Sequence, residues 1–198
     1  PVFHFRKGAL FALGVLLFAG CFACWPGLYG RSKLRVNASR QWSDVRIWAS
    51  SGRYDYIVED GARFLTAMQW DFRFLYDYGY ALHKAGDYWR SNEILGLGMQ
   101  ISSDPMFWNI AGKNYEVLGN QGAAEQAYLH AHSMIPDRVY PLYLLAKLYF
   151  STGQTEKARV TACRAAAYKP KVESVQTREM QAELRELSDC PDSSEIKD

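Results

Sequence analysis

Histidines are the residues of this chain best suited to metal binding or to proton transfer near neutral pH. The 198-residue sequence has four: His4, His83, His130 and His132. His130 and His132 are two residues apart, so on a helix their side chains point in different directions. No HExxH motif or comparable ligand spacing occurs. The histidine pattern therefore predicts no metal site.

The sequence patterns of the common catalytic sites are also absent. Glu59 and Asp60 are adjacent, so on a helix they lie on different faces and are interpreted as solvated surface. There is no Walker phosphate loop, no GxGxxG motif after a strand and no nucleophile elbow. We therefore predict no catalytic residue and no cofactor in this segment.

The cysteines also give no clear sign of a redox site or a disulfide framework. Cys21 and Cys24 have CxxC spacing but lie inside an apolar run, where cysteines are more often small packing residues than a redox pair. Cys163 falls in a predicted helix and Cys190 in a polar tail, and the sequence does not show whether they meet. No disulfide framework is implied.

An internal repeat organises the chain. The stretch from Pro105 to Pro170 matches itself with a shift of 34 residues. The superposed pairs are Trp108 with Leu142, Ala111 with Leu145, Gly112 with Ala146, Tyr115 with Tyr149, Gly119 with Gly153, Ala124 with Ala158, Ala131 with Ala165 and Pro136 with Pro170. This pattern of large, small, aromatic, Gly, Ala, Ala and Pro resembles the tetratricopeptide (TPR) motif, which folds as two antiparallel helices per unit.

The repeated small residues have a mechanical explanation. Gly112 and Ala146 fall where the first helix of a unit should lie closest to its partner, so a larger side chain would separate the two backbones. Gly119 and Gly153 fall at the end of that helix, where positive φ would start the turn. The sequence therefore predicts helical hairpins that turn at these glycines and, in the preceding unit, at Gly86.

The same spacing divides the whole chain into segments. Upstream units match less well: Ser91 and Gly98 stand where alanines are usual, and Leu95 holds an aromatic place. The predicted segments are a membrane helix with its flank (1–30), a basic linker (31–41), repeats over 42–170 in units of about 38–71, 72–104, 105–138 and 139–170, a capping helix (171–187) and a disordered tail (188–198).

An uncharged run of 22 residues, Gly8 to Tyr29, precedes the repeats. As a helix it would be about 33 Å long, close to the hydrocarbon thickness of a bilayer, so the sequence predicts a transmembrane helix. Basic residues flank it on both sides and are denser on the C-terminal side, which favours cytoplasmic repeats. The alternative is a lipoprotein signal ending at Cys21, disfavoured by Phe18 and by the apolar residues that follow the cysteine.

Binding is the remaining function class. The net charge of +2 gives no reason to expect nucleic acid. In TPR stacks, groove-facing side chains recur near the second, fifth, ninth and twelfth positions of each unit. Those places hold Arg73, Tyr76, Tyr80, His83, Asn109, Lys113, Tyr140, Tyr143 and Lys147, together with Trp42, Arg46, Glu116 and Phe150. An aromatic, net basic groove suits an extended protein or peptide with carboxylates, or a glycan stacked on tyrosines; alternatively, these tyrosines pack between units.

The chain also resembles a more specific family. The motifs are Tyr78-Gly79, Gly86-Asp87-Tyr88-x-x-Ser91, Ser103-Asp104-Pro105-Met106, Gly112-Lys113-Asn114-Tyr115 and Asp137-Arg138-x-Tyr140-Pro141-Leu142-Tyr143-Leu144-Leu145-Ala146-Lys147-Leu148-Tyr149. Together with the apolar run, they look like the C-terminal TPR region of O-antigen ligase or polymerase membrane proteins from Bacteroides-type bacteria. The resemblance implies a parent that joins polysaccharide chains, with its catalytic loop upstream of Pro1, so no catalytic residue is carried over.

These observations together predict an all-α protein: an N-terminal transmembrane helix, a TPR-like α-solenoid and a C-terminal capping helix. The predicted function is a membrane-tethered, non-catalytic scaffold in cell-surface polysaccharide assembly at the bacterial inner membrane. The alternative is a free-standing TPR lipoprotein adaptor anchored through Cys21. Because the chain opens with Pro1 and not Met, we expect it to be part of something longer.

Overall fold

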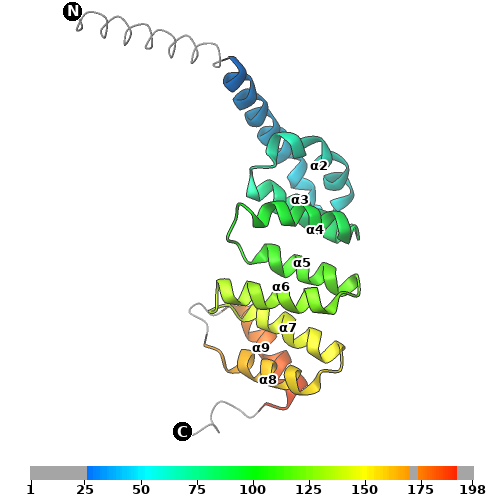
Figure 1. The fold of residues 1–198 in the computed structure, drawn as a ribbon, viewed down its shortest axis with the longest axis vertical. Coiled ribbons are helices and arrows are strands. Elements are labelled where there is room, and N and C mark those ends of the chain that lie inside the picture. The colour runs from blue at the N-terminus through cyan, green and yellow to red at the C-terminus, as the bar shows by residue number, and fades with distance from the viewer. Residues whose placement is uncertain (1–25, 170–173, 191–198) are drawn as a thin grey trace, which may run out of the picture.

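The computed structural model describes residues 26–169 and 174–190, and these residues form a stack of antiparallel helices (Figure 1). The chain is helical over residues 26–46. The elements that follow are η1 (Ile47–Ser51), α2 (Tyr54–Met68), α3 (Phe72–Lys84), α4 (Tyr88–Met99), α5 (Met106–Val117), α6 (Gln121–Met134), α7 (Val139–Ser151), α8 (Thr155–Ala167) and α9 (Val175–Ser188). The described part of the chain is therefore all-α, as predicted.

Consecutive helices pack on one another throughout the stack, from α2 to α9. The first helices of successive hairpins also touch, α3 against α5 and α5 against α7, and α9 contacts both α7 and α8. This is the neighbour-to-neighbour packing of a helical-repeat solenoid, in which stability comes from within each unit and between adjacent units. The prediction of a TPR-like stack is confirmed.

Glycines with positive φ form the predicted turns. Gly86, Gly119 and Gly153 have φ values of 85°, 75° and 71° and connect α3 to α4, α5 to α6 and α7 to α8. A side chain with a Cβ is strained in this left-handed region, whereas glycine is not. The backbone amide that follows each glycine bonds back to a carbonyl of the finished helix, for example Asp87 N to Leu82 O at 3.0 Å.

Small residues let the helices approach closely. A Cβ on Gly112 of α5 would lie 2.3 Å from a ring carbon of Tyr128 of α6, so the predicted close contact is confirmed. The same relation holds between Gly98 and the Phe107 ring, at 2.0 Å. The glycine that weakened the motif match at position 98 is thus explained: Phe107, from the next helix, fills the space that an alanine would have taken.

The first unit departs most from the repeat pattern. Trp42, on the helix over residues 26–46, is 4% exposed and packs edge-on against Phe64 and Phe74 at 5.8 and 4.8 Å between ring centroids. Trp48 lies in η1, is 46% exposed and stacks on Tyr56. Trp42 therefore holds this unit onto α2 and α3, instead of facing a groove.

The predicted fold class needs one correction, in its N-terminal element. No helix in the described part of the chain is long and apolar enough to cross a bilayer, so an N-terminal transmembrane helix is not supported. The helix over residues 26–46 carries Arg31, Lys33 and Arg35 and is largely exposed. The rest of the predicted span, residues 8–25, and with it Cys21, lies outside the described residues, as does most of the predicted tail.

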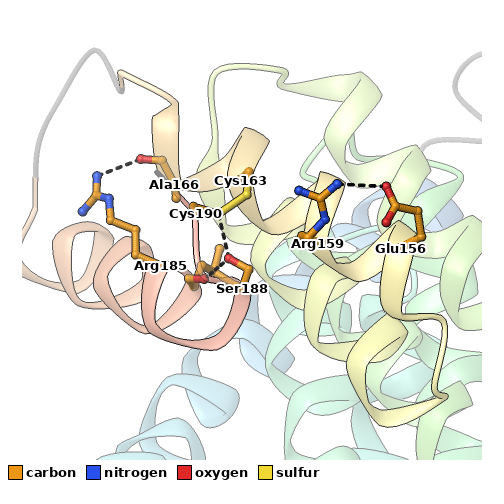
Figure 2. Close-up of a disulfide and its surroundings, with 8 residues drawn as sticks. Glu156, Arg159, Cys163, Ala166, Arg185, Ser188 and Cys190 are labelled. Atoms are coloured by element: carbon orange, nitrogen blue, oxygen red, sulfur yellow. Dashed lines mark hydrogen bonds and ion pairs between the residues drawn. A yellow bond between two sulfur atoms is a disulfide. The ribbon is translucent and has the colours of Figure 1, made fainter. Parts of the chain in front are cut away.

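The structure answers the question that the sequence left open about the two C-terminal cysteines. Cys163 of α8 and Cys190, just after α9, form a disulfide with a Cα–Cα distance of 5.5 Å (Figure 2). The sequence did not reveal this pairing because it depends on α9 folding back along α8, which brings together residues 27 positions apart.

Replacing Gly112 by Ala tests the close helix contact. The added methyl would meet the fully buried Tyr128 ring, so we expect a loss of about 1–3 kcal/mol in the free energy of unfolding. Gly96→Ala is the matched control, because Gly96 lies inside α4 with open space around it; there we expect a gain of up to about 1 kcal/mol. Urea unfolding followed by circular dichroism measures both, and equal stabilities would contradict the packing argument.

Candidate functional site: the face shared by α3, α5 and α7

Side chains of α3, α5 and α7 meet on one side of the stack, which we call the α3–α5–α7 face. Tyr76 of α3 contacts Phe107 of α5 edge-on at 5.5 Å, and Lys113 of α5 lies over the ring of Tyr140 of α7 at 5.3 Å. These are the first helices of three successive hairpins. The structure thus brings most of the predicted groove residues onto one surface.

An aromatic row runs across the N-terminal half of this face. Tyr76 and Tyr80, one helical turn apart on α3, stack with centroids 6.2 Å apart and rings 2° from parallel. Tyr54 meets Tyr80 edge-on from α2, and His83 stacks on it from the following turn. These four side chains are half-buried, so one side of the row stays accessible. Burial also raises the pKa of Tyr76 to about 12, so its hydroxyl remains a hydrogen-bond donor at neutral pH.

Lysines are placed over tyrosine rings along the same face. A cation held over an aromatic ring is stabilised by the quadrupole of the ring, by about 0.5–1 kcal/mol at an exposed site. The three pairs are Lys84 over Tyr80 at 5.4 Å, Lys113 over Tyr140 at 5.3 Å and Lys147 over Tyr143 at 5.4 Å. The face therefore carries both aromatic surface and positive charge.

Lys113 is the central cation of this face. It is half-buried, as is Tyr140, whose ring stacks on that of Tyr143 at 6.4 Å. Among the residues that the structure describes, Lys113 makes no ion pair. An ammonium group over a tyrosine ring, with no carboxylate of the described chain against it, is suited to an acidic ligand group.

At the C-terminal end, the chain supplies such a carboxylate itself. Glu183 of α9 accepts a hydrogen bond from the Tyr143 hydroxyl at 2.6 Å and another from the Lys147 ammonium at 2.8 Å. The bond to Glu183 raises the pKa of Lys147, and the bonds from Lys147 and then Tyr143 lower the pKa of Glu183. These side chains are largely exposed, so the pair contributes at most about 1 kcal/mol to stability.

A buried polar network supports the aromatic row from behind. Asn114 of α5 is fully buried, and its amide nitrogen donates to Ser91 and Asn92 of α4, both at 2.8 Å. Its amide oxygen lies 2.6 Å from Nδ1 of His83. Because that oxygen only accepts, His83 carries its proton on Nδ1. Burial lowers the pKa of His83, which favours the neutral ring.

Asn114 was missed as a site residue by the sequence analysis. It falls between the positions that face the groove in TPR units, although it belongs to the Gly112-Lys113-Asn114-Tyr115 motif. A polar residue flanked by helix-packing positions was the available signal. Its partners lie 22 to 31 residues away, so only the fold revealed its role.

Two predicted groove residues lie apart from the aromatic row. Arg73 is exposed at the first turn of α3, with its guanidinium 5.7 Å from the Phe72 ring. Asn109 is 2% exposed; its amide nitrogen donates to the Met106 sulfur at 3.6 Å, and its oxygen has no partner within the described residues. The exposed Arg73 side chain is accessible to a ligand, whereas the buried Asn109 side chain is not.

Metal chemistry finds no support in the part of the chain that is described. There, no group of three His, Cys, Asp or Glu side chains could hold a metal ion. The histidines make separate contacts: His130 lies against Trp108 at 4.1 Å, and His132 lies beside Arg164 at 3.3 Å. His4 is outside the described residues.

Comparison with known proteins agrees with a TPR-type fold. No family model matches the chain, and no curated protein does. The structure is similar to TTC0263, a TPR protein of Thermus thermophilus, at 20% identity over 87% of this chain and 95% of that one, with a TM-score of 0.58. It is also similar to MamA, at 18% identity over 77% of this chain and 85% of that one, with a TM-score of 0.57.

A third similar structure contains a bound partner. It is PcrH in complex with the chaperone binding region of PopD, which is 18% identical over 58% of this chain and 86% of that one, with a TM-score of 0.50. At these identities the likeness concerns the fold. The chain thus has a TPR-type fold.

Removing the Asn114 side chain tests the buried network. Asn114→Ala would leave Ser91, Asn92 and His83 without their shared partner, so we expect a loss of about 2–4 kcal/mol in the free energy of unfolding. Asn92→Ala removes a single bond of the same network and should cost about 1 kcal/mol or less. Chemical denaturation distinguishes the two, and an Asn114 variant as stable as the Asn92 variant would contradict a shared network.

The lowered pKa of His83 predicts a pH dependence. In the unfolded chain a histidine titrates near 6.5, so the unfolded state takes up the proton first as the pH falls. The stability that neutral His83 gives above that pH should then be lost progressively below it, down to the folded-state pKa. We expect His83→Gln to flatten the stability profile between pH 7.5 and 5. NMR titration of the His83 ring measures the pKa directly, and a midpoint at or above 6.5 would disprove this.

Proposed function

We propose that these repeats bind an extended, acidic protein segment along the α3–α5–α7 face. The observation that carries the proposal is Lys113, half-buried over the Tyr140 ring and without an ion pair among the described residues. A peptide carboxylate placed there would reproduce the contact that Glu183 makes with Tyr143 and Lys147. Charge-assisted hydrogen bonds of this kind are about twice as strong as neutral ones.

The shape of the stack favours an extended ligand over a compact one. Cationic and aromatic groups are distributed over the first helices of three successive hairpins, α3, α5 and α7, and are not gathered in one pocket of the described chain. An extended peptide presents side chains at regular intervals along such a row. Rigid tyrosines also provide contact area at a low cost in side-chain entropy, because they have few rotatable bonds.

The structural comparisons support a protein partner. The PcrH structure holds the chaperone binding region of PopD, which is a segment of another protein. A similar use of this chain would need a surface that accepts a segment of a partner, and the aromatic, basic α3–α5–α7 face has suitable chemistry.

We further propose that the repeats are the non-catalytic tail of an O-antigen ligase or polymerase type protein, acting in cell-surface polysaccharide assembly at the bacterial inner membrane. Support comes from the motif resemblance, which includes Gly86-Asp87-Tyr88 at the turn between α3 and α4 and Gly112-Lys113-Asn114-Tyr115 on α5. On this proposal the acidic segment belongs to a protein of the polysaccharide machinery, and the repeats hold it near the enzyme.

Charge removal on the face tests the binding proposal. We expect Lys113→Ala to weaken binding of a fluorescein-labelled Glu-rich decapeptide about threefold to tenfold, and Lys113→Ala with Tyr80→Ala to weaken it further. Fluorescence anisotropy measures the dissociation constant. Because the contacts are partly exposed, the wild-type affinity should also fall between 50 and 300 mM salt, concentrations chosen to shorten the screening length by more than half.

Lys157→Ala is the matched control for this experiment. Lys157 also lies over a tyrosine, Tyr149, at 5.1 Å, but on α8, where it pairs with Glu125 of α6. Its removal should leave peptide affinity unchanged. Equal losses at Lys113 and Lys157 would indicate non-specific charge attraction, and binding of a neutral oligosaccharide in place of the peptide would favour a glycan ligand.

A further inference from the structure

The closing helix α9 is held mainly by polar and covalent contacts. Its buried residues are Gln181, Leu184 and Ser188, so Leu184 is the one large apolar side chain that it buries. Gln181 donates from its amide nitrogen to the carbonyl oxygens of Ala165 and Tyr168, at 3.0 and 2.7 Å. Arg185 donates to the carbonyl of Ala166 at 2.9 Å (Figure 2). These bonds occupy carbonyls at the C-terminal end of α8.

The disulfide completes this attachment. Figure 2 shows it joining Cys163, in the middle of α8, to Cys190, beyond the last turn of α9. The loop that it closes contains all of α9. Compared with the same chain with free thiols, closing a loop of this length raises the equilibrium constant for docking of α9 by on the order of a hundredfold. With so little apolar burial of its own, α9 depends strongly on that bond.

The docked position of α9 has a consequence for the binding face. It places Glu183 on Tyr143 and Lys147, where the carboxylate takes two hydrogen bonds. Lys113, one unit earlier on α5, lies over Tyr140 of α7 and has no such carboxylate within the described residues. Glu183 therefore acts as an internal ligand that covers the last lysine–tyrosine pair of the face.

We infer that the Cys163–Cys190 disulfide is a thiol-responsive latch, which keeps α9 docked and Glu183 on the Tyr143–Lys147 pair when it is closed, and frees that pair for an acidic segment when it is reduced. The second half of this statement rests on the proposed peptide binding. The first half, control of α9 by the bond, does not depend on it. Both cysteines are half-buried, so a small reductant can reach them.

The chemistry is thiol–disulfide exchange with a dithiol protein or small molecule. One thiolate of the dithiol attacks a sulfur of the latch, the S–S bond breaks, and the other cysteine leaves as a thiolate and takes up a proton. The second thiol of the reductant then attacks the mixed disulfide, which yields two protein thiols and an oxidised reductant; two electrons pass to the protein. An oxidising compartment keeps the latch closed, in contrast to the cytoplasmic setting favoured by the flanking charges.

Hydrogen exchange tests the latch itself. We expect the α9 amides of the full chain to exchange on the order of a hundredfold faster after treatment with dithiothreitol, while those of α5 are unchanged. The variant carrying Cys163→Ser and Cys190→Ser should behave like the reduced protein and no longer respond to reductant. Equal α9 exchange in all forms would overturn the proposal.

Binding of a fluorescein-labelled Glu-rich decapeptide tests the effect on the face. Reduction, or Glu183→Gln in the oxidised protein, should tighten binding about threefold, because it frees one partly exposed cation. Glu186→Gln is the control, since Glu186 is exposed on the same helix and makes no ion pair within the described chain. Faster α9 exchange with unchanged affinity would overturn the gating half. If the peptide binds neither the oxidised protein, the reduced protein nor the variants, the proposed function is refuted. Hydrogen exchange of the α9 amides would then still test whether the disulfide controls α9.

Discussion

The close approach of paired helices is the constraint on which the rest of this structure depends. At Gly112 the α5 backbone lies against the Tyr128 ring, and at Gly98 the α4 backbone lies against Phe107. In the last hairpin, the small residues Ala146, Ala158 and Ala162 are fully buried. Because Gly98 and Gly112 leave room for a large side chain of the next helix, the hairpins stack at short distance, and the first helices of successive units come near enough to form a common face.

That face combines two physical effects that are weak separately. A lysine over a tyrosine ring is held in place without a carboxylate, and the tyrosine hydroxyl next to it can bond an incoming acidic group. The contact of Glu183 with Tyr143 and Lys147 is an example within the molecule itself. It also shows that the chain uses one of its own acidic residues at the end of the stack, where α9 covers what a further repeat would have covered.

The predictions from sequence succeeded where a local rule was sufficient. The turns at Gly86, Gly119 and Gly153 followed from the repeat, because positive φ at the end of a helix selects glycine. The prediction of a transmembrane helix was wrong for the described chain, because hydrophobicity was judged over the uncharged run alone, whereas the helix over residues 26–46 continues through basic residues in an exposed position. The role of Trp42 was also misjudged, since its burial depends on Phe64 and Phe74 from two other helices.

The amino-acid sequence by itself determined the all-α repeat, its hairpin turns and the aromatic, basic character of one face, because all of these follow from residue type at a fixed spacing. Only the tertiary structure decided which of those residues are accessible, that Asn114 joins α3, α4 and α5 through His83, Ser91 and Asn92, and that Cys163 meets Cys190. The physical reason is distance along the chain. These contacts join residues more than 20 positions apart, and their geometry is set by how whole helices pack.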